Sequence, residues 1–238
     1  MAAVRILREH PDFLIVHKPP GVEMHDATHG IVSQVSALTG YTGLHLCHRL
    51  DTVTSGVMCL ARHPDAAASI GEQFATRQVQ KYYLALSAQK PKKKQGTVKG
   101  DMRNRRGGQH ILLKTVENPA ITQFFSSSVA PGLRGFLIKP HTGKTHQIRV
   151  ALKSLGAAVL GDSLYGGGSA DRTYLHAWAL AFCHNDEQIQ CVSAPQQGQH
   201  FLSPEFTTWL ADQPPPDNLP WPHVAPLPSA AAGRGHAP

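Results

Sequence analysis

The stretch HRLDTVTSGVMCLAR, residues 48–62, is the part of this 238-residue chain on which the fold prediction depends. Its second half, SGVMCLAR, is an apolar run with the length of a buried strand. Its first half carries a single carboxylate, Asp51, after an arginine and before small hydroxyl residues and a glycine. A lone acid at the start of a core strand, in a basic chain, needs an explanation.

If HRLD is extended, its side chains alternate between two faces. Arg49 and Asp51 then share one face, and His48 and Leu50 share the other. Residues 54–56 predict a tight polar turn, in which a carboxylate can serve as a nucleophile or a base. The simpler interpretation is that Asp51 caps a turn and that Arg49 is a solvated charge. The stretch alone leaves both interpretations open.

The rest of the chain predicts an α+β fold. Strands are expected at residues 13–18 and 81–86, and two more within 121–140, joined by a Pro-Gly turn. Helices are expected over 64–78, 145–156 and 203–213, with Gly156 ending the second and Ser203 capping the third. Strands alternating irregularly with helices indicate a mixed, mostly antiparallel sheet flanked by helices and loops. We predict one domain over 1–212 and a Pro/Ala-rich tail over 213–238, extended or disordered unless Trp221 docks on the body.

The composition favours a polyanionic partner. Lys and Arg number 23 against 16 Asp and Glu, which gives a net charge of +7, and the isoelectric point is about 9.4. Nucleic acid is the simplest partner for such a surplus. No apolar run is long enough to cross a membrane, and the N-terminus shows no signal segment, so a cytoplasmic protein is expected. The four cysteines form no C-x-x-C pair and are expected to be reduced core thiols.

Two further stretches concentrate positive charge. KPHTGKTHQIRV (139–150) gathers cations and histidines around a glycine turn at a predicted helix start, where backbone N–H groups attract phosphate. QKPKKKQGTVKGDMRNRRGGQH (89–110) has eight cations and one acid, and without apolar periodicity it is expected to be a mobile loop that contacts phosphates. Solvated charge is the alternative for both stretches.

These stretches, in this order, resemble the RluA-type family of RNA pseudouridine synthases. HRLDTVTSG is similar to the family's HRLDxxTSG segment, KYYLAL to its Lys-x-Tyr-x-Ala segment, and HTGKTHQIRVALKSLG with GDSLYGG to a third block. VHKPPG and LHAWALAF match an early and a late block. The likeness runs from about Val16 to about Phe182. Lys144 replaces a usual arginine and Ala151 a common histidine, which affects details of the third block rather than the reaction class.

The resemblance implies that a uridine is detached at its N1–C1′ bond, turned, and rejoined through C5, without a metal or organic cofactor. It implies that Asp51 is the catalytic carboxylate, either attacking the sugar or removing a sugar proton. Tyr83 would stack on the base and assist proton movement at C5, and Arg149 would pair with Asp51. Arg49 would fill the space of the flipped uridine. The residues expected to contact RNA are Arg49, His48, Lys92, Lys93, Lys94, Arg103, Arg105, Arg106, Lys144 and His146.

The expected partner is structured RNA, ribosomal or transfer, and the expected state is a monomer that binds neither membrane nor metal. Two alternatives are considered. An RNA-binding protein of the same fold without activity would share the basic stretches but would not need Asp51, Tyr83 and Arg149 together. A metallohydrolase would use histidines 45, 48, 141 and 146, whose spacing does not match a strong metal motif.

Overall fold

A computed structural model describes residues 3–224. The helices are α1 (Ile31–Thr39), α2 (Pro64–Ala75), α3 (Gln147–Ser154) and α4 (Pro204–Ala211), with a short 3₁₀ turn at Arg106–Gly108. The strands are β1 (Arg5–Glu9), β2 (Phe13–Lys18), β3 (His45–Leu46), β4 (Ser55–Ala61), β5 (Gln80–Ser87), β6 (Gln95–Gly100), β7 (Met102–Asn104), β8 (His110–Leu112), β9 (Ala120–Ala130), β10 (Leu133–Pro140), β11 (Leu175–His184) and β12 (Glu187–Val192). None of the helices in the described part of the chain is both long and apolar enough to span a bilayer.

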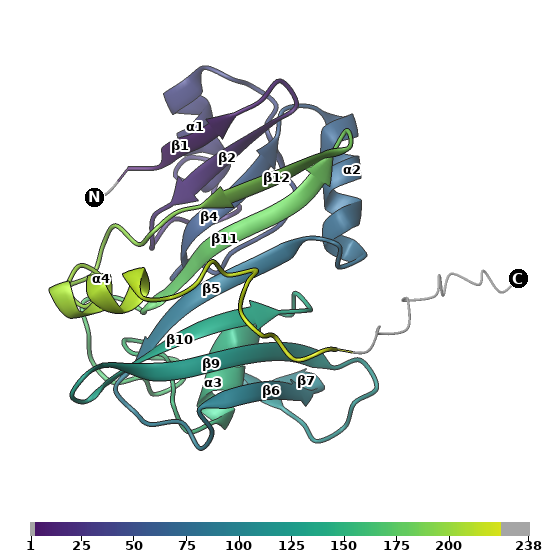
Figure 1. Ribbon diagram of the computed structural model, residues 1–238. Coiled ribbons are helices and arrows are strands. Elements are labelled where there is room, and N and C mark those ends of the chain that lie inside the picture. The colour runs from purple at the N-terminus through teal and green to yellow at the C-terminus, as the bar shows by residue number, and fades with distance from the viewer. Residues whose placement is uncertain (1–2, 225–238) are drawn as a thin grey trace, which may run out of the picture.

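One long sheet organises the chain, in the order β1-β2-β4-β11-β5-β10-β9-β6, with β3 paired to β4 and β12 to β11 (Figure 1). Among the described strands only the β4–β11 pairing is parallel, so the predicted mixed, mostly antiparallel sheet is confirmed. Helix α2 lies against the β4–β11 half, while α3 lies behind the β10–β9 half in Figure 1 and α4 in front of it. The predicted helices and the β9–β10 hairpin are all present.

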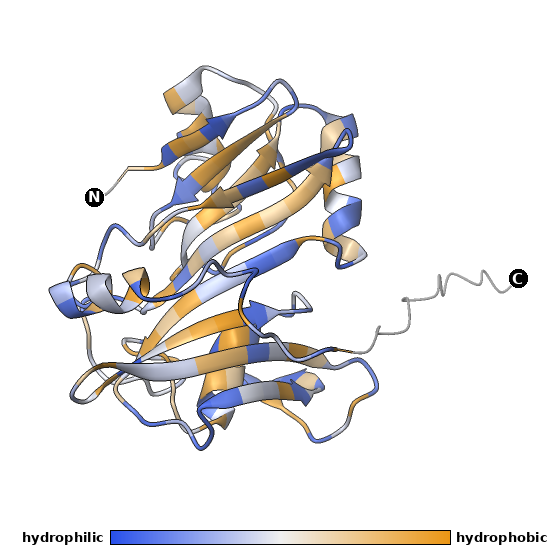
Figure 2. Cartoon of the chain, viewed as in Figure 1, coloured by the Kyte–Doolittle hydropathy of each residue, from blue (hydrophilic) through white to orange (hydrophobic). Residues whose placement is uncertain are grey.

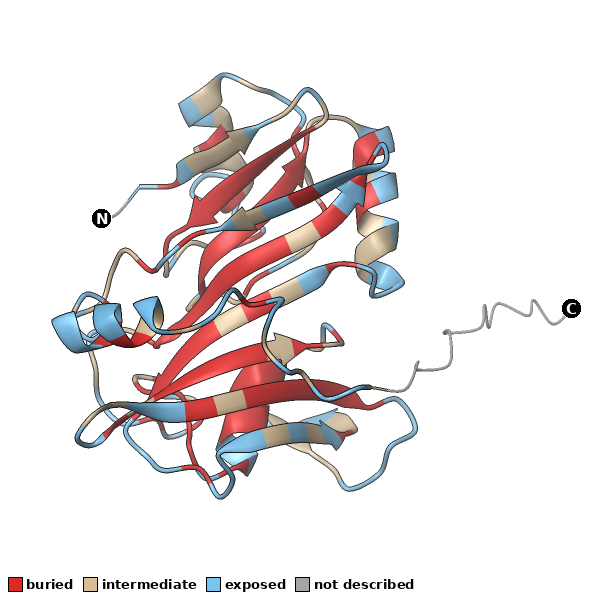
Figure 3. Ribbon diagram, in the orientation of Figure 1, coloured by how far each residue is buried: buried red, intermediate tan, exposed pale blue. Residues whose placement is uncertain are grey.

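The inner strands are apolar and buried, and the outer strands are polar and exposed (Figures 2 and 3). In β2 and β4 every residue is buried, because both faces of these strands are covered. The edge strand β6 instead alternates exposed and half-buried residues over its first five positions and ends at the buried Gly100. The site described below lies in the buried middle of the sheet, where neighbouring strands hold one another in place.

The opening stretch folds differently from its predicted alternation. Residues 47–54 form an irregular loop rather than a strand, and its turn is closed by the N–H of Thr54 donating to the carbonyl of Asp51. Ser55 and Gly56 belong to β4, not to the turn. A Cβ on Gly56 would lie 2.1 Å from the carbonyl oxygen of Ala177, so β4 can meet β11 only with a glycine there. The close packing of β4 on β11 at Gly56 therefore places Ser55 and Gly56 in a strand, although their residue types predict a turn.

The prediction of a mobile loop over 89–110 is wrong for most of its length. Strand β6 pairs with β9 along the sheet edge, and β7 and β8 form a separate two-stranded ribbon. The sequence conceals β6 because an edge strand turns most side chains to water, and only Val98 packs against the core. The lysines at 92–94 precede β6 and are exposed.

The cysteines and the tail follow the sequence predictions only in part. Cys47 and Cys59 are buried free thiols as expected, but Cys183 is exposed, because its end of β11 pairs only with the outer strand β12. Trp221 packs on the sheet, with its ring centroid 4.9 Å from that of Phe125. The first part of the predicted tail, residues 213–224, therefore contacts the sheet through Trp221. The remainder of the predicted tail, 225–238, lies outside the described residues. The division into domain and tail stays a prediction.

Candidate active site

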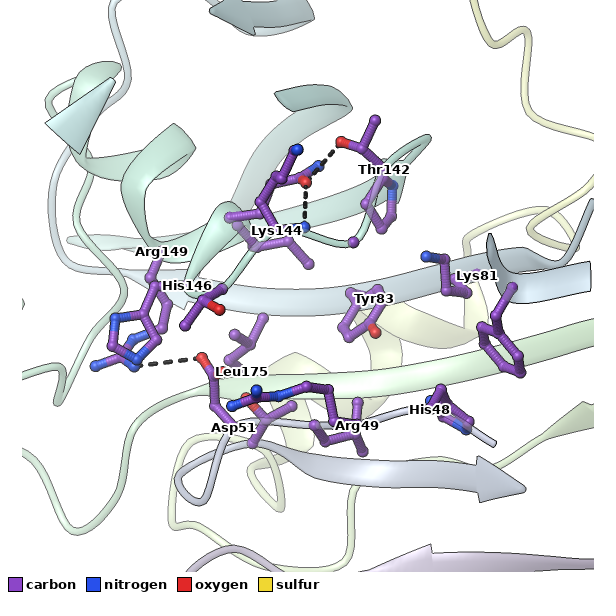
Figure 4. Close-up of a pocket in the computed structure, with 18 of the residues that line it drawn as sticks. His48, Arg49, Asp51, Lys81, Tyr83, Thr142, Lys144, His146, Arg149 and Leu175 are labelled. Atoms are coloured by element: carbon purple, nitrogen blue, oxygen red, sulfur yellow. Dashed lines mark hydrogen bonds and ion pairs between the residues drawn. The ribbon is translucent and has the colours of Figure 1, made fainter. Parts of the chain in front are cut away.

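A cleft of about 300 Å³ opens where the loop before β4, strand β5 and the turn between β10 and α3 come together. Asp51 and Arg149 lie at one end, Lys81 at the other, and Tyr83 between them (Figure 4). A second hollow of about 260 Å³ adjoins the first and shares Asp51 and Arg149 with it. Asp51 thus stands between two spaces that a ligand can occupy.

The carboxylate of Asp51 has a single cationic partner among the described residues. Arg149 Nη1 lies 3.3 Å from Asp51 Oδ2, so the pairing that the family resemblance implies is present in the structure. The two residues are 98 positions apart and meet because α3 begins beside the loop before β4. Whether this pair carries the chemistry stays a prediction.

A second carboxylate, Asp162, holds the guanidinium of Arg149 in place. This residue is not among those that the sequence predicts for the site. Asp162 is 1 % exposed and accepts hydrogen bonds from Arg149 Nε at 2.7 Å and Nη2 at 2.9 Å. Burial disfavours the charge of Arg149, but the bonds to Asp162 and the field of Asp51 outweigh it and raise the pKa of the guanidinium. With Nε and Nη2 engaged, Nη1 is left to face Asp51.

Asp162 lies in GDSLYGG, the end of the third family block. The loop is tight: the N–H of Gly167 donates to the carbonyl of Asp162, and a Cβ on Gly167 would lie 1.7 Å from the carbonyl oxygen of Val159. The same loop presents Tyr165, whose hydroxyl is 2.9 Å from His146 Nδ1. The only feature of the sequence that could have pointed to Asp162 is an acid placed among glycines. This feature does not reveal that the partner of Asp162 is Arg149.

Tyr83 and Lys81 lie on the same face of β5, because side chains two apart on a strand point the same way. Tyr82 points to the opposite face and packs beneath Trp221. Burial, and then the charge of Asp51, raise the pKa of Tyr83 well above its ordinary value. Its hydroxyl therefore keeps its proton at neutral pH and can donate a hydrogen bond to a ligand.

Of the other residues predicted to contact RNA, some lie in the cleft with groups available to a ligand, and one is engaged within the protein. Arg49 is exposed and lines both hollows, and Lys144 lines the cleft with its Nζ 3.0 Å from Asn118 Oδ1. His48 also lines the cleft, but its Nε2 accepts the N–H of Cys59 and burial lowers its pKa to about 3. A neutral, engaged ring of this kind suits a pocket wall better than a phosphate contact.

The basic stretch is split between two places. The ribbon that carries Arg103, Arg105 and Arg106 packs against the cleft wall through His110, whose ring centroid is 5.2 Å from that of His146, a residue that lines the cleft. The three arginines themselves do not line it. Residues Lys92–Lys94 instead lie beside the C-terminal end of α3, where the N–H of Lys92 donates to the carbonyl of Leu155. They do not line the cleft.

The metallohydrolase alternative finds no support in the geometry. Among residues 3–224, only His10, Asp12 and His184 bring three metal-binding atoms close together, and this group includes none of the histidines at 45, 48, 141 and 146. The group is also accounted for by its own bonds, since Asp12 contacts His184 at 2.6 Å and His63 at 3.0 Å.

A buried lysine, Lys18, holds the loop that carries Asp51 through hydrogen bonds to backbone carbonyls. Lys18 has no exposed surface, and its ammonium donates to the carbonyl oxygens of Pro19 at 3.2 Å, Val22 at 2.8 Å and Thr52 at 3.2 Å. Thr52 follows Asp51 directly. The lysine therefore joins the Pro-Pro-Gly turn after β2 to the loop that positions the carboxylate.

We expect Lys18→Met to lower the free energy of unfolding by about 1–3 kcal/mol, since three buried carbonyls lose a charged donor. Urea unfolding of the variant and of wild type measures the difference. Lys90→Met, at an exposed position, is the matched control and should leave stability within error. Equal stability of Lys18→Met and wild type would show that these carbonyls are satisfied in another way.

Comparisons with known proteins give one consistent result for the chain as a whole. The family model described as RNA pseudouridylate synthase matches residues 12–154. A Haemophilus influenzae protein described as an uncharacterized RNA pseudouridine synthase is 45 % identical over 84 % of this chain and 92 % of its own length. The ribosomal large subunit pseudouridine synthase C of Salmonella typhi is 30 % identical over 82 % of this chain and 66 % of its own. The solved structure of human RNA pseudouridylate synthase domain containing 1 aligns with a TM-score of 0.70 and 29 % identity, over 81 % of this chain and 83 % of that one.

Proposed function

The chain belongs to the RNA pseudouridylate synthase family and is an isomerase of that class; we propose that it converts a uridine of a structured RNA to pseudouridine, with Asp51 as the catalytic carboxylate. The observation that carries the proposal is the Asp51–Arg149–Asp162 arrangement at the end of a cleft. Of these three charged side chains, Asp51 is the most exposed, at 18 %, so its carboxylate is the one that can reach the sugar of a bound nucleotide. A structural ion pair would not need to face an open cleft of ligand size.

The residues around the cleft support distinct steps of this reaction. The target uridine leaves its stack to enter the cleft, and the exposed Arg49 takes its place in the RNA. Tyr83 stacks on the uracil and assists proton movement at C5 through its hydroxyl, which keeps its proton. Asp51 acts at the ribose, as nucleophile or as base. A glycosidase needs a second acid for its leaving group, whereas here the detached base is rejoined through C5.

We propose ribosomal RNA of the large subunit as the first substrate to examine, because that is what the Salmonella relative's name states. Transfer RNA is the second. Single-nucleotide pseudouridine maps of both RNA fractions, from wild type and a deletion strain, identify the site. We expect at least one pseudouridine to disappear on deletion and to return with the wild-type gene but not with Asp51→Asn. Identical maps would refute the proposal and leave the non-catalytic RNA-binding protein as the better description.

We expect Tyr83→Phe to lower single-turnover rates by about tenfold while RNA affinity changes little, because the ring still stacks and only the hydroxyl is removed. Tyr82→Phe is the matched control, since that hydroxyl bonds Gln80 on the opposite face of β5. Its turnover should match wild type. Damage from Tyr82→Phe alone would show that the base lies on the other face.

The two parts of the basic stretch predict different effects on RNA. Replacing Lys92, Lys93 and Lys94 by Ala should flatten the slope of log affinity against log salt by about 0.7–0.9 for each phosphate that the protein no longer neutralises. Replacing Arg103, Arg105 and Arg106 by Ala should flatten it similarly and also slow turnover at saturating RNA, because that ribbon packs against His146 of the cleft wall. Binding measured at several salt concentrations gives both slopes. An unchanged slope would mean that the cations concerned stay solvated.

A further inference from the structure

The cleft holds a lysine whose charge has no partner among residues 3–224. Lys81 is partly buried on β5, and the described residues offer its ammonium neither a hydrogen-bond acceptor nor a carboxylate. Its Nζ lies beside the turn before α3, because a Cβ on Gly143 would come within 3.9 Å of it. In Figure 4 the side chain points into the cleft next to Tyr83. An amine placed in this way is available to a ligand.

The surroundings of Lys81 make its neutral amine more accessible than that of a solvated lysine. Burial lowers the pKa of Lys81 to about 8. The ionisable groups around it come from three elements and from the far end of the cleft. They are Cys47, His48 and Arg49 from the loop before β4, Tyr83 on its own strand, His141, Lys144 and His146 from the turn before α3, and the Asp51–Arg149 pair. His48 and His141 are neutral, with pKa values lowered by burial to about 3 and about 4. Asp51, the carboxylate that lines the cleft, is already paired with Arg149.

The reaction given under the proposed function, on which this inference rests, needs a base near the uracil. When C5 bonds to C1′, C5 still carries its hydrogen, which must leave as a proton. Asp51 is at the sugar end of the cleft and paired with Arg149. Tyr83 keeps its own proton, so it assists at C5 as a hydrogen-bond donor rather than as the base. Positions 81 and 83 are about 6.6 Å apart along the strand, so the flexible lysine side chain reaches the edge of a ring stacked on Tyr83.

We propose that the neutral amine of Lys81 is the base that removes the C5 proton of the turned uracil. Lys81 Nζ takes the hydrogen as a proton, and the C5–H electron pair restores the C5–C6 double bond. The electrons thereby displaced return to N1, which takes a proton from water, and the ammonium releases its proton to solvent through the open cleft. One proton leaves C5 and one arrives at N1, so no other reactant is needed. Lys81 is then a catalytic residue.

The test uses the full-length protein and RNA from a deletion strain labelled with tritium at uridine C5. Tritium released to water reports cleavage of the C5–H bond, and mass spectrometry of the digested RNA reports the new bond to C5. The variants are Lys81→Met, which removes the amine, and Lys81→Arg, which keeps a positive charge but cannot become neutral at ordinary pH. Lys153→Met, an exposed position on α3, is the control.

We expect both Lys81 variants to release tritium about 100-fold more slowly than wild type, the scale of a missing general base, with RNA affinity within about twofold. The wild-type rate should rise with pH, reach half of its maximum near pH 8, where half of the amine is neutral, and level off above that. The variants should lack this dependence. Lys153→Met should behave as wild type.

Three results would overturn the inference: normal release by Lys81→Met, recovery of activity in Lys81→Arg, or a defect that appears only as weaker RNA binding. The second and third would show that Lys81 serves as a fixed positive charge. Absence of both tritium release and pseudouridine with wild-type protein would instead refute the proposed function itself, so the two failures are distinguishable.

Discussion

Asp51→Asn is expected to abolish pseudouridine formation, lowering the single-turnover rate by at least about a thousandfold, while the protein stays folded and binds RNA. The substitution keeps the size of the side chain and removes the negative charge that either role, nucleophile or base, requires. It also leaves an amide oxygen to accept the bond from Arg149 Nη1. The measurement is product formation with excess enzyme, alongside RNA affinity and urea unfolding of the same preparation.

Asp65→Asn is the matched control, since this carboxylate is exposed in the first turn of α2, outside the cleft. It should retain wild-type turnover. Substantial activity in purified Asp51→Asn, free of wild-type enzyme, would remove Asp51 from the chemistry. Loss of folding rather than of turnover would assign Asp51 a structural part, as the turn-capping interpretation holds.

Arg149→Met is the second large effect that we expect, and it acts on stability as well as activity. Removing the guanidinium leaves Asp162, which is 1 % exposed, as an uncompensated buried charge. Breaking a buried ion pair on one side costs about 3–5 kcal/mol of unfolding free energy. Asp51 loses its partner at the same time, so turnover should fall even at temperatures where the variant is folded.

The double variant Arg149→Met with Asp162→Leu separates the two effects. With the buried carboxylate gone, we expect most of the stability to return, because an apolar replacement of both partners is often nearly neutral. Activity should stay low, since nothing then faces Asp51. Recovery of activity along with stability would contradict the assignment, because it would show that Arg149 matters only for folding. Urea unfolding and single-turnover assays on both variants and wild type give the answer.

Local pattern was enough to predict several elements. Pro64 and Ser203 mark helix starts that the structure confirms, with Ser203 accepting the N–H of Phe206. The family blocks were also readable in order, and the family is confirmed. These features depend on neighbours a few positions away, so the sequence carries them directly.

Pairing at the sheet edge was not predictable in the same way. Residues 95–100 become a strand because β9 offers a free edge, although the segment QGTVKG has only one apolar residue facing the core. The loop before β4 is likewise irregular rather than a strand, although Leu50 is buried in the N-terminal core and Arg49 remains in water as the alternation predicts. Interactions between residues distant in sequence outweigh weak local preference in both places.

The sequence by itself indicated several central strands and the helices over 64–78, 145–156 and 203–213, the family, and the acid proposed for the candidate site. Only the tertiary structure decided which charges meet. It brings Asp162 to Arg149 and leaves Lys81 without a partner among the described residues. Residue type states that a side chain carries charge, but its pKa and its partners depend on burial and on groups far away in the chain. That dependence is why one half-buried lysine on KYYLAL can serve as a base while the lysines of KPKKK lie exposed, away from the cleft.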